Sequence, residues 1–175
     1  MIDYKNMPRE DVLKKAYETA FAYERDYGNC PQSMLATMHD LFGIGDEDAF
    51  KSGTGMAGGG ALAGQGTCGA LVGGFMAIGL VFGRGPEDYK VRKGAGRAYR
   101  AAKVLHDRFV KEFGGVVCKD VQKKIFGRAF NLLDREEYQL FEKMGGHTDK
   151  CTDVVGKVAV WTADIILDEL TKQKK

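Results

Sequence analysis

The chain has 175 residues, 44% of them hydrophobic and 29% charged, so it is long enough to bury the core of one domain and is not disordered in character. Its formal net charge of +2 is too small to indicate nucleic acid as a partner. No stretch alternates between apolar and polar residues as a strand would. We therefore predict an all-α fold, a single-domain helical bundle of about seven helices over residues 1–175.

Apolar residues recur at helical spacing along most of the chain, and glycines or N-cap residues separate the periodic segments. Pro86 should open the longest helix, which we expect to run to Phe113 with Tyr99, Leu105 and Phe109 facing inward. The last helix should bury a stripe that includes Val158 and Ile166. The predicted helices cover residues 8–27, 29–42, 46–51, 68–82, 86–113, 118–126, 134–144 and 149–170, of which 46–51 is only a short turn.

The segment from Ser52 to Phe82 carries no charged residue. Its first part, residues 53–66, is too rich in glycine to form a good helix and should be a flexible loop or lid near Cys68. It contains the letters of a dinucleotide fingerprint, but no strand precedes them and no helix follows. The second part reads as a helix that is apolar on nearly every side. At about 15 residues it is shorter than the roughly 20 that a membrane span needs, so it should lie buried at the centre of the bundle.

The chain has four cysteines, and each follows a turn signal and begins a predicted helix. The free N–H groups and positive dipole of a helix start lower a thiol pKa and favour the thiolate. Lys119 and Lys150, each next to a cysteine, should act in the same direction. The helical spacing also turns all four thiols towards the core, so they could meet at one end of the bundle. The four cysteines are Cys30, Cys68, Cys118 and Cys151.

The alternative for these cysteines is packing, since a free cysteine often behaves as a small buried hydrophobe. The chain has no Cys-x-x-Cys-His, so covalent haem attachment is not supported. Among the three histidines, only His147 is placed to join a cysteine site. The first residues, Met1 to Glu10, lack the apolar core of a secretory signal, so we expect a cytoplasmic protein whose thiols are kept reduced unless oxidation is part of the function.

The order of these cysteines resembles the C_GCAxxG_C_C family of redox-active proteins. The resemblance covers about residues 28–161 and depends on Asn29-Cys30-Pro-Gln-Ser, on Gly66-Thr-Cys68-Gly-Ala-Leu-Val-Gly73 before an apolar helix, and on Cys118 and Cys151. The central motif departs from the family name, because it reads Cys-Gly-Ala-x-x-Gly instead of Gly-Cys-Ala-x-x-Gly. The resemblance implies redox activity centred on the four cysteines as catalytic, cofactor-binding or metal-binding residues.

The resemblance leaves several mechanisms open. Relatives fused to cytochromes carry an iron–sulfur cluster, so a small cluster, with 2Fe–2S favoured, is the first cofactor to expect, and the function would then be electron transfer. The rival is an oxidoreductase without a cofactor, in which one thiolate attacks a disulfide and a second cysteine resolves it. A non-catalytic helical binding protein is the third alternative. The redox partner is unknown, a homodimer is an open alternative, and neither nucleic acid nor a membrane is expected as a partner.

Overall fold

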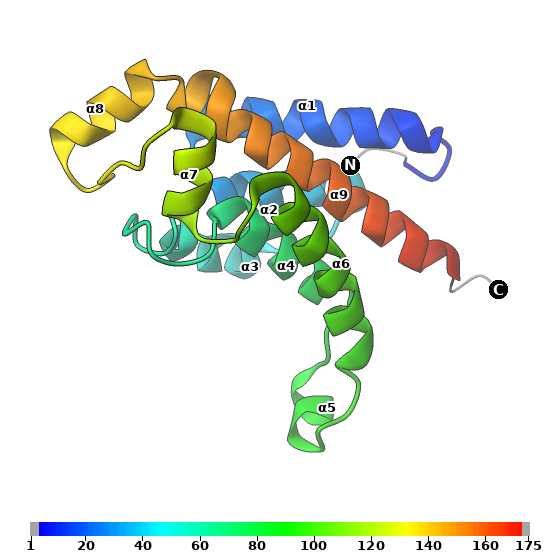
Figure 1. Ribbon diagram of the computed structural model, residues 1–175. Helices are drawn as coiled ribbons and strands as arrows, with labels where there is room; N and C mark the ends of the chain where they lie inside the picture. Colours follow the sequence, from blue (N-terminus) through cyan, green and yellow to red (C-terminus); the bar gives the residue numbers. More distant parts are fainter. Residues whose placement is uncertain (1–3, 173–175) are drawn as a thin grey trace.

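In the computed structural model, which describes residues 4–172, the chain is a bundle of helices with both ends on the side away from α8 (Figure 1). Within those residues the only strand-like pairing is one isolated antiparallel bridge, between Thr67 and Val117. The predicted all-α class is confirmed, with nine α-helices in the described part of the chain instead of about seven. They are α1 (Arg9–Tyr27), α2 (Cys30–Phe42), α3 (Glu47–Ser52), α4 (Gly69–Phe82), α5 (Pro86–Lys90), α6 (Gly96–Phe113), α7 (Cys118–Phe126), α8 (Arg135–Lys143) and α9 (Cys151–Lys172), with a 3₁₀ turn at Thr54–Met56 and a π-helical turn at Gly146–Lys150.

The apolar helix α4 lies at the centre of the bundle, packed against α2, α6 and α9, as predicted. Its close approach to α2 depends on Gly73, where an added Cβ would lie 2.6 Å from Met34 Cβ and 2.9 Å from the carbonyl oxygen of Pro31. The beginning of α4 therefore lies directly against the beginning of α2. α4 has 14 residues, and no helix within residues 4–172 is long and apolar enough to cross a membrane.

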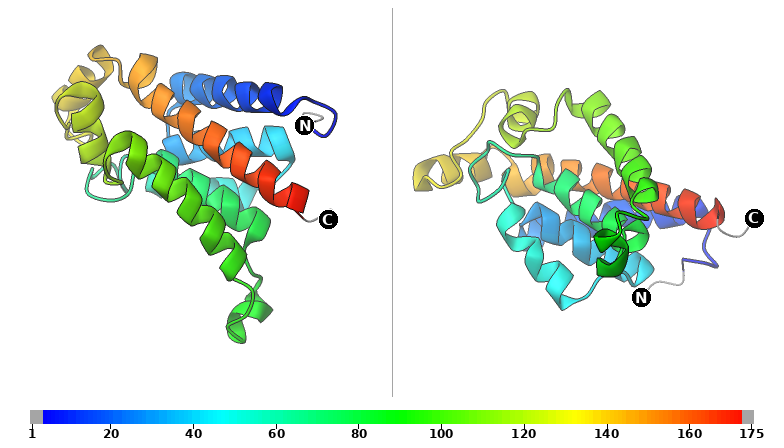
Figure 2. Two further views of the ribbon diagram at one scale, coloured as in Figure 1. Left: turned by 45° about the vertical axis from the view of Figure 1, so that its right-hand side comes forward. Right: turned by 90° about the horizontal axis from the view of Figure 1, so that it is seen from below.

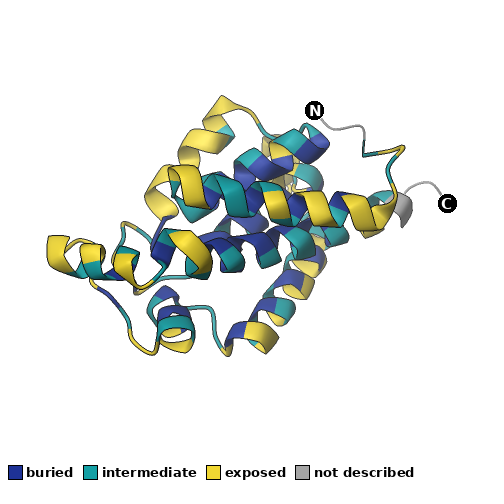
Figure 3. Cartoon of the chain, turned by 90° about the horizontal axis from the view of Figure 1, so that it is seen from above, coloured by how far each residue is buried: buried dark blue, intermediate teal, exposed yellow. Residues whose placement is uncertain are grey.

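Helices α1 and α9 run alongside each other and form the most extensive helix pair of the bundle (Figures 1 and 2). The predicted stripe of α9 is buried, with Val158 and Ile166 fully inaccessible. Arg9 at the start of α1 is paired with Asp164 of α9, and Arg108 of α6 reaches the same carboxylate at 2.7 Å. Figure 3 shows buried residues along the inner helices and exposed residues on α8 and the outer faces.

The predicted long helix 86–113 is wrong, because the structure divides it into α5 and α6. Between them Arg92 and Gly94 have φ angles of 56° and 87°, a left-handed conformation that interrupts an α-helix. The resulting arm around α5 projects away from the bundle (Figure 2). Leu105 and Phe109 of α6 are buried as predicted, but Tyr99, expected to face inward, is 67% exposed because it lies off the helix face that those two residues share.

Candidate functional site

All four cysteines stand at helix beginnings, as predicted. Cys30, Cys118 and Cys151 are the first residues of α2, α7 and α9, and Cys68 is the N-cap residue of α4. These beginnings gather at the end of the bundle that carries α7 and α8 (Figure 1). As whole residues, Cys68 and Cys118 are buried and Cys30 and Cys151 are half-buried.

A short backbone ladder joins the segments that precede Cys68 and Cys118. Cys68 donates its backbone N–H to the carbonyl oxygen of Val116 at 2.7 Å, and Cys118 donates to that of Gly66 at 2.9 Å. These two bonds flank the bridged pair described above. Since successive side chains of extended backbone alternate between faces, both cysteine side chains leave the same face of the ladder. Residues 50 positions apart are thereby held side by side.

The glycine-rich segment lies against this ladder. An added Cβ at Gly59 would lie 2.8 Å from Cys118 Cβ, so only glycine allows the loop to approach this cysteine so closely. The predicted position of the loop near the cysteine site is therefore correct. We expected a flexible loop or lid, and the structure shows a segment held by its own backbone hydrogen bonds, among them Gly64 N–H to Gly58 O at 2.8 Å and Gly66 N–H to Gly59 O at 2.9 Å.

Cys30 lies beside the start of α4. An added Cβ at Gly69 would be 3.1 Å from Cys30 Sγ, which places this sulfur next to the residue that follows Cys68. Cys30 also lines a cavity of about 210 Å³, together with Cys118 and Cys151. Cys68 lies behind this cavity and interacts electrostatically with both Cys30 and Cys151. The structure thus brings the four predicted cysteines into one neighbourhood.

The prediction of low-pKa thiols is wrong for this conformation. Burial raises the pKa of Cys68 from 9.0 to about 12, although the backbone amides of Ala70 and Leu71 act against it as a helix start should. Burial likewise raises the pKa of Cys118 to about 11, and burial together with neighbouring acidic groups raises the pKa of Cys30 and Cys151 well above 9.0. Desolvation outweighs the helix dipole because it removes water from the whole thiolate. All four therefore carry their protons at neutral pH.

Stability should consequently fall in alkaline solution. Above about pH 9 the unfolded chain ionises its thiols, whereas folded Cys118 and Cys68 hold their protons up to pKa values of about 11 and about 12. The stabilisation that these two protonated thiols provide is complete below pH 9 and is lost as the pH rises towards those values. It amounts to about 1.4 kcal/mol for each unit by which the folded pKa exceeds the unfolded pKa. Denaturant unfolding under reductant measures this slope. Cys118→Ala should flatten it, and an unchanged slope would contradict the assignment.

Two further residues that the cysteine pattern does not point to also line the cavity. They are Glu24 of α1 and His147 of the π-helical turn. His147 was the one histidine whose place in the sequence could bring it to a cysteine site, although a surface position was the default expectation for all three, and its Nδ1 lies 2.6 Å from Oε1 of Glu142. Glu24 was missed. It continues the buried series of Val12, Ala16 and Ala20 at four-residue spacing, so an acid in line with an apolar stripe is the signal that could have found it.

The side chains do not form a metal site as they are placed. Within residues 4–172 no group of three or more cysteine, histidine, aspartate or glutamate side chains is arranged to hold a metal ion. The four cysteines are free thiols. Four cysteines are the usual donor set of a small iron–sulfur cluster, so the chemistry of these residues suits one. Their side chains as placed do not assemble into such a site.

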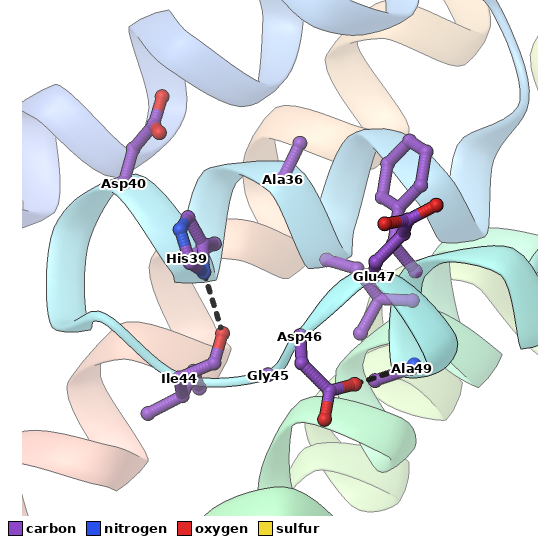
Figure 4. A pocket seen from close by; sticks show the side chains of 10 residues that line it. Ala36, His39, Asp40, Ile44, Gly45, Asp46, Glu47 and Ala49 are labelled. Atoms are coloured by element: carbon purple, nitrogen blue, oxygen red, sulfur yellow. Dashed lines mark hydrogen bonds between the residues drawn. The ribbon is translucent and has the colours of Figure 1, made fainter.

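A second cavity, of about 270 Å³, lies between α2 and α3 and has no cysteine in its walls (Figure 4). Its polar groups serve the backbone that connects the two helices. A ring nitrogen of His39 lies 3.2 Å from the carbonyl oxygen of Ile44, and Asp46 caps α3 by accepting a hydrogen bond from the backbone N–H of Ala49 at 2.9 Å. The polar groups of this cavity are therefore explained by the connection between the two helices. The cavity lined by Cys30, Cys118 and Cys151 remains the candidate functional site.

The fold and site define a helical protein whose four separated cysteines share one buried neighbourhood. Residues 28–165 match the family described as "Putative redox-active protein (C_GCAxxG_C_C)", and the chain belongs to this family. The resemblance that the cysteine pattern suggested is therefore confirmed, and with it the coarse assignment of redox activity. Comparison with curated proteins and with solved structures found no match.

Proposed function

We propose that the protein is an oxidoreductase that exchanges its own thiols with a partner disulfide without a cofactor. The observation that carries the proposal is the meeting of all four cysteines at one end of the bundle, three of them in the walls of one cavity. Thiol exchange needs an attacking thiol that a substrate can reach and a second thiol close behind it. Cys30 and Cys68 meet this description.

In the proposed reaction the sulfur of Cys30 bonds to one sulfur of the partner disulfide, and the partner's S–S bond breaks. The sulfur that leaves takes up a proton and departs as a thiol. Cys68 then attacks the sulfur of Cys30, and the second half of the partner departs as a thiol. The partner disulfide gains two electrons, and Cys30 and Cys68 lose two as they form a disulfide. In the reducing cytoplasm that the sequence predicts, cellular thiols would restore the dithiol.

Cys118 and Cys151 extend this pair. Cys118 is held beside Cys68 by the backbone ladder, and the electrostatic interaction of Cys151 with Cys68 is its largest with any thiol. A disulfide formed at Cys68 could therefore be passed to either neighbour. Both cysteines also line the cavity, so they remain part of the proposed catalytic set.

Electron transfer through a 2Fe–2S cluster remains a prediction from the family resemblance. Because the donors do not fit a cluster as they are placed, no step is routed through one. Binding would require the four sulfurs to move and lose their protons. Iron and sulfide analysis of anaerobically purified protein therefore belongs in any test of the proposed reaction.

Thiol titration tests the proposal. Protein purified anaerobically and fully reduced should be colourless and should show four thiols. Treatment with a small aromatic disulfide should lower the count to two, and a dithiol reductant should restore it. A count that stays at four would favour cysteines that only pack. Stoichiometric iron and sulfide with visible absorption would favour the cluster instead.

A further inference from the structure

Glu24 is a buried acid that packing does not account for. Its side chain is 1% exposed, and it continues a buried stripe of α1 whose remaining members are valine and alanine. Placing a carboxylate in such a position is unfavourable unless the carboxylate is well paired. No cation contacts it at hydrogen-bond distance, since the nearest, His147, has its Nε2 3.8 Å from Oε1. A costly residue at a cavity wall points to a chemical role.

The groups around Glu24 connect it to the thiol site. Its Oε2 accepts a hydrogen bond from Ser33 Oγ at 2.8 Å. Burial raises the pKa of Glu24, and hydrogen bonds from Ser33 and the Cys30 thiol, with the nearby His147, act in the opposite direction. The titratable groups that face it from the packed elements are Cys30, Cys68, Cys151, Tyr138, Glu142 and His147.

We propose that Glu24 is the catalytic base that accepts the proton of the Cys30 thiol when Cys30 attacks a partner disulfide. The inference rests on the proposed function. It supplies what that function lacks, because a thiol must lose its proton to attack a disulfide, and Glu24 lies with Cys30 in the wall of one cavity. The S–H bond of Cys30 breaks, the proton passes to the Glu24 carboxylate, and the new thiolate bonds to the partner's sulfur. The other sulfur of the partner disulfide leaves as a thiolate and takes up a proton, so that one proton is lost by Cys30 and one is gained by the leaving group.

His147 and Glu142 offer the proton a path to solvent. The Nδ1 atom of His147 lies 2.6 Å from Oε1 of Glu142, and Nε2 on the other side of the ring faces Glu24. The side-chain exposure rises along this series, from 1% for Glu24 through 23% for His147 to 36% for Glu142. The 3.8 Å gap between His147 and Glu24 is about 1 Å longer than a hydrogen bond, so a small movement completes the path. His147 is in this scheme a positioning and relay residue.

The test uses the full chain with Cys68→Ser, so that the mixed disulfide on Cys30 accumulates, and dipyridyl disulfide as the probe. Glu24→Gln should lower the rate of Cys30 modification by roughly 100-fold or more, as expected when a general base is removed. Glu24→Asp should recover part of the rate. Glu18→Gln is the matched control, because Glu18 lies on the same helix, 53% exposed and only loosely paired with Lys14, and its rate should not change.

Two further readings separate a chemical role from a structural one. Because folding raises the pKa of Glu24, its ionised form weakens the fold at neutral pH, so Glu24→Gln should leave Tm unchanged or raise it while reactivity falls. In the Cys68→Ser protein with Glu24 intact, the rate of Cys30 modification should fall at acid pH as Glu24 takes up a proton. This measurement does not depend on whether a Glu24 variant folds. A Glu24→Gln rate and pH profile equal to those of the parent would overturn the inference. A Cys30 that does not react at all would instead overturn the proposed function.

Discussion

Cys68→Ser is expected to turn the protein into a trap for its partner. In the proposed reaction Cys68 releases the partner by an intramolecular attack, and such a step gains a factor of about 10³ or more over attack by thiols in solution. Without this thiol the mixed disulfide on Cys30 should persist. Serine is close to cysteine in size and is a favoured N-cap residue, so the fold should be retained. Mass spectrometry after incubation with a small disulfide should find one adduct on Cys30 in the variant and none in the wild type.

Cys118→Ser is the matched comparison for this experiment. Cys118 is also buried and is held beside Cys68. The sulfur of Cys30, however, lies next to Gly69, the residue that follows Cys68 at the start of α4. Replacement of Cys118 should leave release from Cys30 intact. An adduct that accumulates in Cys118→Ser and not in Cys68→Ser would assign the resolving role to Cys118 and contradict the proposed pair.

Gly59→Ala is expected to have the second large effect, on the geometry of the site itself. Gly59 has a φ of 78°, and an added Cβ would lie 2.8 Å from Cys118 Cβ and 3.0 Å from the carbonyl carbon of Gly64. The left-handed conformation alone should cost alanine about 1–2 kcal/mol. The overlap with backbone and with the cysteine should add about 1–3 kcal/mol and displace Cys118 from its neighbours.

Gly60→Ala isolates the contribution of the overlap. Gly60 has nearly the same φ, 80°, but an added Cβ meets nothing within 4 Å. Both variants carry the backbone strain, and only Gly59→Ala carries the clash. Denaturant unfolding should therefore show a distinctly larger loss of stability for Gly59→Ala, and its Cys118 should react faster with an alkylating agent. Equal losses for the two variants would show that the loop does not hold Cys118 in place.

Local signals were sufficient to predict the frame of this protein. Turn residues before each cysteine predicted four helix beginnings, and the apolar run after Cys68 predicted the buried helix α4. Both depend on residues that are close in sequence. The left-handed Arg92 gives no warning of the break between α5 and α6, but Gly94 beside it is a signal that could have indicated the break. The exposure of Tyr99 was missed because this residue lies off the helix face that Leu105 and Phe109 share.

The chemistry of the site depended on long-range packing and could not be predicted in the same way. The helix-start argument for Cys68 was correct in its direction, since Ala70 and Leu71 do favour the thiolate, but burial decides the sign of the pKa shift. How deeply a thiol lies is set by segments such as the loop at Gly59, which reach it only in the folded chain. Glu24 was missed for a related reason, because its role depends on contacts with residues of other elements.

The account depends on Cys30 and Cys68 being close enough to share a disulfide. Wild-type protein should be oxidised mildly with a substoichiometric small disulfide, digested without reductant and mapped by mass spectrometry. The predicted result is a Cys30–Cys68 cross-link as the first intramolecular disulfide, removed by a dithiol. Oxidised protein in which Cys30 carries no intramolecular bond, or in which only Cys118 and Cys151 are joined, would contradict the account.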